Sequence, residues 1–176
     1  SNNAVPAATD TATFDDSCVS NCNPLINASI SVARINMKST YAGTITQNSG
    51  RTITIGNGGW TQAGGNFVGG DAAIQVNGVT VISAGTFTST SAVLEFKNAV
   101  TMTGASFVHA SGTVDLNLNC QIVDFNLGMK TLDKFRILGQ CGVVNLQGSI
   151  ITVLSGFELR DTNGGILNNG TIEAQG

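Results

Sequence analysis

Apolar and polar residues alternate along most of the chain in runs of three to five, and glycine, asparagine or serine separates the runs. A period of two is typical of a half-buried β-strand, whereas an amphipathic helix repeats every three to four residues. The pattern therefore predicts an all-β protein made of short strands joined by tight turns.

A similar sequence phrase returns about every 20 residues. A phenylalanine closes a group of small residues, and an alternating apolar pair follows it. A unit this short cannot bury its own apolar side chains, so successive units have to stack. Stacking would align the equivalent residues in inward-facing ladders, whose predicted members are Phe67, Phe87, Phe107, Ile74, Leu94 and Val114.

The predicted fold is a parallel β-helix, or β-solenoid, with about six coils of 20–22 residues and strands spaced roughly 4.8 Å apart. Crossover handedness favours a right-handed coil, although the rule is weaker for solenoids. We expect the solenoid to occupy residues 30–176. Residues 1–29 are expected to form an N-terminal extension that holds a disulfide loop and partly caps one end.

Spacings near one coil length predict further contacts. Trp60, Val81 and Met102 recur at 21 residues and are expected to form another apolar column. Arg136 and Glu158 are 22 residues apart on outward positions, so they are expected to form an exposed ion pair. Three asparagines that follow the apolar pair are expected to stack at one turn: Asn57, Asn77 and Asn117.

Four cysteines are present. Cys18 and Cys22 lie in a polar loop, which favours a local disulfide over a zinc site, because zinc would need two more ligands. Cys120 and Cys141 are 21 residues apart, one coil, so stacking would bring them within reach of a disulfide. An unlinked buried pair is the alternative for these two residues.

The charge content excludes some partners. Only 11% of residues are charged, and the net charge is −3 with eight basic residues, so no nucleic-acid footprint is expected. The apolar runs are too short to predict membrane insertion. The chain starts without methionine or an apolar leader, so an exported protein would have lost an upstream signal, or the chain is part of a longer one.

Several phrases resemble the repeat modules of very large bacterial surface proteins, namely the segments 12–15, 41–47 and 85–91. The resemblance covers roughly residues 4–120. It implies an exported, β-helical, adhesin-like or fibre-forming module at the cell surface or outside the cell. It brings no catalytic residue to this chain.

The ends of a solenoid carry unpaired strands. The segment 170–176 reads as the first strand of an unfinished coil, and Val5 to Phe14 has no obvious partner within its own coil. We therefore expect copies to join head to tail in a filament. A tandem module of one longer chain and a capped monomer are the alternatives. The candidate interface residues are Val5, Ala12, Phe14, Ile172 and Ala174.

Two stacked carboxylates, Glu95 and Asp115, could act as acid and base on a glycan or bind calcium. They lack the cluster of further acids and bases that such sites need, and Lys97 is expected to neutralise Asp115 across the strands. His109 has no acidic partner in sequence. The expected function is therefore structural, without an enzyme activity, cofactor or metal. A module that binds surface glycans is the alternative, and a polysaccharide-degrading enzyme is less favoured.

Overall fold

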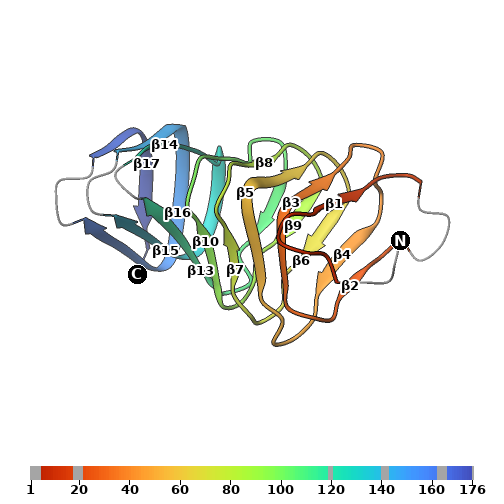
Figure 1. The fold of residues 1–176 in the computed structure, drawn as a ribbon. Helices are drawn as coiled ribbons and strands as arrows, with labels where there is room; N and C mark the ends of the chain where they lie inside the picture. Colours follow the sequence, from red (N-terminus) through yellow and green to blue (C-terminus); the bar gives the residue numbers. More distant parts are fainter. Residues whose placement is uncertain (1–4, 18–21, 119–120, 140–142, 162–165, 176) are drawn as a thin grey trace.

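The computed structural model describes residues 5–17, 22–118, 121–139, 143–161 and 166–175, and all regular elements in these ranges are strands. They wind into a β-solenoid of parallel strands, which runs in Figure 1 from the N-terminal turns on the right to the C-terminal turns on the left. This confirms the predicted fold class. Seven rungs stack on one face, about one more than expected, and the first of them begins at Ile30.

Each turn presents three faces, and the longer strands bend around a corner to serve two or three of them. Face 1 is made of β7 (Ile74–Val76), β10 (Val93–Phe96), β13 (Thr113–Leu118) and parts of β3 (Ile30–Met37), β5 (Ile53–Gln62), β15 (Met129–Gly139) and β16 (Val143–Asp161). Face 2 is made of β1 (Thr11–Phe14), β8 (Thr80–Ile82), β11 (Val100–Thr101), β14 (Ile122–Asn126) and parts of β3, β5, β16 and β17 (Ile166–Ala174).

Face 3 begins as a separate five-stranded sheet. Its strands are β2 (Leu25–Ile26), β4 (Thr44–Gln47), β6 (Asn66–Val68), β9 (Thr86–Thr88) and β12 (Ser106–Val108). In the later turns the same side is formed by residues 129–132 of β15, 150–153 of β16 and 171–174 of β17.

The phenylalanine ladder is confirmed. Phe67 pairs in register with Phe87, and Phe87 with Phe107. The ring centroids are 5.0 and 6.1 Å apart, and Phe67 and Phe87 are fully buried. On face 1, Ile74, Leu94 and Val114 likewise align with one another. Each inward position is occupied once per turn. A large ring at such a position is therefore buried by the apolar side chains at the same position in the turns before and after it.

Trp60 is a core residue, as predicted, but its column is not the one expected. It aligns with Thr80 and then Val100, whereas the side chain of Val81 is exposed. Face 1 pairs residues 21 apart at this level, Ile53 with Ile74, whereas face 2 pairs residues 20 apart, and the apolar pattern could not reveal that Thr80 faces inward. Trp60 instead contacts Phe67, with ring centroids 4.7 Å apart.

The expected asparagine ladder is wrong. Asn77 and Asn117 are separated by a turn that places Lys97 between them, and Asn57 falls one position beyond their column. Asn117 donates instead to Glu95.

One corner depends on glycine. Gly65 and Gly85 adopt φ angles of 64° and 78°, and a Cβ on Gly85 would lie 1.8 Å from the carbonyl oxygen of Gly65. Successive turns approach so closely here that no larger residue fits.

Face 3 is interrupted between β12 and β15. In the described part of the chain, β12 pairs with β9 alone and residues 129–132 pair only with β16, while faces 1 and 2 continue across the same level. The register from Val100 to Phe125 spans 25 residues, against 20 from Thr80 to Val100. Face 1 keeps a spacing of 21 residues from Thr113 to Lys134, so the longer spacing is confined to face 2 at the level where the pairing of face 3 stops.

Candidate functional surfaces

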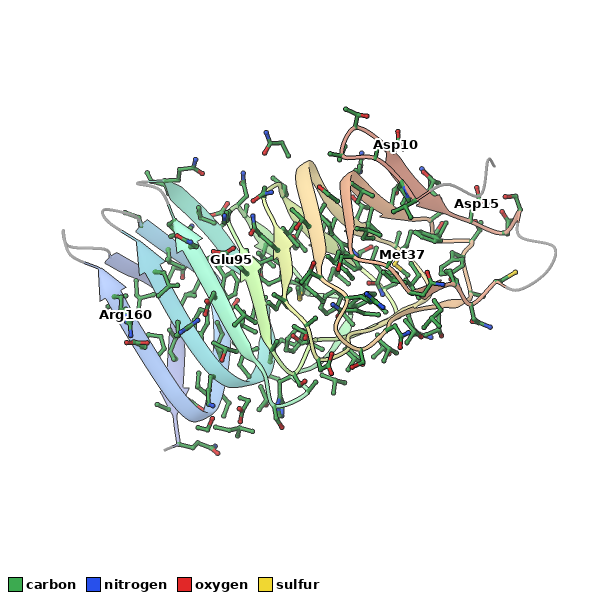
Figure 2. The ribbon with its side chains drawn as sticks, turned by 60° about the horizontal axis from the view of Figure 1, so that its bottom comes forward. Asp10, Asp15, Met37, Glu95 and Arg160 are labelled. Carbon is green, nitrogen blue, oxygen red and sulfur yellow. The ribbon has the colours of Figure 1, made fainter. Side chains whose placement is uncertain are left out.

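The outward positions of face 1 form a polar ladder with one residue per turn. Its members pair in register from turn to turn and are Ser31, Thr54, Gln75, Glu95, Asp115, Arg136 and Glu158. Figure 2 labels Glu95 and Arg160 on strands of this face. The two acids singled out by the sequence, Glu95 and Asp115, are therefore stacked neighbours as expected.

Asp115 forms its ion pair with the turn above. Arg136 donates from Nε to Asp115 Oδ1 at 2.7 Å and from Nη2 to Oδ2 at 2.5 Å. The side chain of Asp115 is only 5% exposed and that of Arg136 33% exposed. The hydrogen bond to Asp115 holds the pKa of Arg136 above its ordinary value, so the guanidinium stays charged.

Two expected ion pairs are corrected by this geometry. Arg136 stacks beside Glu158 but pairs with Asp115, and Glu158 binds Arg160 two residues along its own strand. Lys97 lies 3.6 Å from Glu95 rather than neutralising Asp115. A bidentate ion pair with a nearly buried carboxylate is stronger than a single exposed contact. This explains why Arg136 pairs with Asp115 and not with Glu158.

Glu95 is also fully engaged. Asn117 donates from Nδ2 to Glu95 Oε1 at 2.7 Å, and Lys97 lies beside Oε2. Each acid of the stacked pair thus has a cationic or amide partner, so the ladder is arranged as a cross-turn polar network. His109 lies in a turn, where its Nδ1 accepts a hydrogen bond from the backbone of Ser111.

The structure gives no metal site in its described ranges, where no group of three histidine, cysteine or acidic residues converges. Nor is there, in those ranges, a helix long and apolar enough to cross a membrane.

The predicted disulfides stay predictions. Cys18, Cys120 and Cys141 lie outside the described residues. Cys22 lies inside them, and its carbonyl oxygen accepts a hydrogen bond of 2.7 Å from the hydroxyl of Tyr41. Burial raises the pKa of that hydroxyl, so Tyr41 remains protonated and donates to the backbone at Cys22.

The N-terminal interface candidates are placed differently from one another. Val5 is exposed, whereas Ala12 and Phe14 are on β1, which pairs in parallel with β3. The expectation was that this segment has no obvious partner within its own coil, and the partner of β1 is a strand of the next turn, which makes β1 the first rung of face 2. Phe14 is half-buried and lies 5.6 Å from the ring of Tyr41.

The C-terminal candidates lie on the last rung. Ile172 pairs with Ile151 and Ala174 with Val153, so both occupy inward register positions of face 3. Ile172 is only partly buried, whereas Ile151 one turn earlier is fully buried. Ile151 has a described turn on each side of it, whereas Ile172 has one on one side only, and this accounts for the lower burial of Ile172.

A groove that the sequence reasoning missed opens at the interruption of face 3. Its lining includes Ser106, Phe107, Met129, Lys130, Thr131 and Thr152, and its volume is about 560 Å³. The spacing of 25 residues from Val100 to Phe125 distinguishes this level of the solenoid. It could not be used in the sequence analysis, because the pairing of these two residues is known only from the structure.

No protein-family model matches the sequence, and neither a curated protein nor a solved structure matches it.

Proposed function

We propose that the protein is a structural subunit of an extracellular filament, sheath or adhesin, in which copies join end to end by stacking strands. The observation that supports this most is the state of the two end rungs. Among the described residues, β1 pairs only with β3, and β17 pairs only with β16. Each end rung therefore has one strand edge whose backbone groups have no ladder partner, and such edges template the addition of another strand.

The side chains of the end rungs suit such a contact. Ala12 and Phe14 lie on the first rung of face 2, and Leu167 lies on the last rung of the same face, where it pairs with the buried Val144. In the interior of the stack, inward residues are fully buried by their neighbours. A second copy on either end would complete that burial while continuing the parallel ladder.

The contact would join two different surfaces, the first rung of one copy and the last rung of the next. Heterologous contacts of this kind produce open filaments when the rotation does not close a ring. The low proportion of charged residues, 11%, limits repulsion between successive copies. The resemblance to bacterial surface modules supports an extracellular location as part of the same proposal.

Electron microscopy of the purified chain, with light scattering over a range of concentrations, tests the proposal. Ile172→Lys places a charge on the last rung and should abolish rods. Ile122→Lys is the matched control, because Ile122 is 79% exposed on the side of the solenoid and should leave rods intact. Monodisperse monomers of the unaltered chain at high concentration, or rods that survive Ile172→Lys, would contradict the proposal.

A further inference from the structure

The groove on face 3 lies where the solenoid leaves two strand edges facing each other. On one side is β12 and on the other are residues 129–132 of β15, and within the described chain these two segments form no ladder with each other. Between these edges the groove has a volume of about 560 Å³ and is open to solvent. Its size is within the range of small-ligand sites.

An aromatic ring lines this groove. Phe107 is the last ring of the phenylalanine ladder and is stacked on Phe87 with an interplanar angle of 8°. Phe67 and Phe87 are fully buried, but Phe107 is only partly buried. Its remaining exposure borders the groove. The ring therefore offers an apolar surface whose covering would be favourable.

A cation occupies an inward register position beside that ring. Lys130 aligns with Ile151, which is fully buried, and Ile151 aligns with Ile172. Lys130 is half-buried, and within the described residues it forms no ion pair with an acid. An anionic ligand in the groove would supply the ion pair that Lys130 lacks among the described residues.

The other polar groups of the groove are neutral. Ser106, Thr131 and Thr152 carry hydroxyl groups that can both donate and accept hydrogen bonds, and Met129 and Ile150 add apolar surface. Among the residues that the structure describes, no other charged side chain lines the groove. The groove thus combines one cation, several hydroxyl groups and one aromatic ring.

We infer that this groove binds a sugar-acid unit of an acidic polysaccharide. The apolar face of the sugar ring covers Phe107, the sugar hydroxyls bond to Ser106, Thr131 and Thr152, and the carboxylate pairs with Lys130. One ammonium matches the single carboxylate of a uronic acid. The inference goes beyond the structural role proposed above, and it stands whether or not the copies form filaments.

Calorimetry with a tetramer of galacturonic acid tests the inference, with its methyl ester as the neutral comparison ligand. The acid should bind the unaltered chain about tenfold more tightly than the ester, the ratio that one charge-assisted hydrogen bond supplies. The preference should weaken as salt is added.

The variant Lys130→Met distinguishes an effect on ligand binding from an effect on the stability of the fold. Methionine suits the position aligned with Ile151, so the variant should be at least as resistant to thermal unfolding, while the preference for the acid disappears. Lys134→Met is the matched control, because Lys134 is exposed on the other limb of β15 and does not line the groove.

The inference would be overturned by no binding of the acid by the unaltered chain, by equal binding of acid and ester, or by a preference that survives Lys130→Met. Loss of binding in Lys134→Met as well would also overturn it, because the anion would then be attracted by general charge. None of these results depends on whether rods form, so failure here is distinguishable from failure of the proposed structural function.

Discussion

Asp115 and Arg136 occupy the same position on consecutive turns, and two hydrogen bonds of 2.7 and 2.5 Å join their side chains. The pair links the strands of β13 and β15 at the level where face 3 is interrupted. At this level face 3 has, within the described ranges, no strand pairing between the two turns. The ion pair on face 1 therefore adds a side-chain link between turns where the backbone link of face 3 is missing.

Asp115→Asn should lower the free energy of unfolding by about 1–2 kcal/mol, because it removes the charge that Arg136 faces in a nearly buried setting. Arg136 is one-third exposed, so water offsets part of the loss. Urea denaturation measures the change. Glu158→Gln is the control and should cost less than about 0.5 kcal/mol, because its pair with Arg160 is exposed. Equal effects of the two substitutions would show that Asp115 has no special role.

Two buried threonines should respond in opposite directions to replacement by valine. Thr80 is 1% exposed, and its hydroxyl has no hydrogen-bond partner among the described residues. Thr80→Val should therefore stabilise the chain by about 1 kcal/mol, because valine has the same shape without the buried hydroxyl.

Thr90 is equally buried, but its hydroxyl donates to the carbonyl oxygens of Gly70 and Ala72 at 3.1 and 2.7 Å. Thr90→Val should destabilise the chain by about 1–3 kcal/mol. Thermal unfolding of both variants provides the measurement, and a destabilising Thr80→Val would contradict the assigned environment.

The phenylalanine ladder should show a graded response. Phe87→Ala should cost about 3–5 kcal/mol, because it empties the space between two other rings. Phe107→Ala should cost less, since its side chain is only partly buried beside the groove. Chemical denaturation of the two variants gives the comparison. A Phe107→Ala variant as unstable as Phe87→Ala would mean that the groove is closed in solution.

Acid should weaken one turn-to-turn contact selectively. The hydroxyl of Ser49 and the backbone N–H of Gly50 donate to Asp71, and these bonds hold the pKa of Asp71 below its ordinary 3.8. Because the folded state lowers the pKa, the contribution to stability is present above about pH 3.8 and is lost as the pH falls through the folded value.

The stability difference between the unaltered chain and Asp71→Asn should thus be constant near neutral pH and shrink below pH 3.8. Ser49→Ala should reduce this pH dependence, because the Ser49 hydroxyl is the largest cause of the lowered pKa. A difference that grows in acid would contradict the assignment.

The sequence predicted the fold because the repeat length equals one turn, so a large residue such as Phe67 recurs where its equivalent must be buried. It did not predict the column of Trp60, because face 2 pairs residues 20 apart where face 1 pairs residues 21 apart, and because Thr80, a polar residue, faces inward. The repeat length predicts which residues pair only where the corners of successive turns contain the same number of residues.

The surfaces were harder to predict for a related reason. Arg136 has an acid one turn before it and another one turn after it, and spacing alone favours neither. The choice depends on burial and bidentate geometry, which are properties of the packed turns. The sequence did not single out Lys130, because the groove residues Ser106 and Phe107 come from a different turn, and the 25-residue spacing on face 2 is recognised only from the register.

The 20-residue turns of the phenylalanine ladder give the rod a mechanical property. Backbone hydrogen bonds between turns lie along the long axis, so tension on the two ends would separate turns one after another. Each freed turn would supply roughly 70 Å of extended chain in place of about 5 Å of rod. A rod of this kind lengthens many-fold under load before its chain is fully taut.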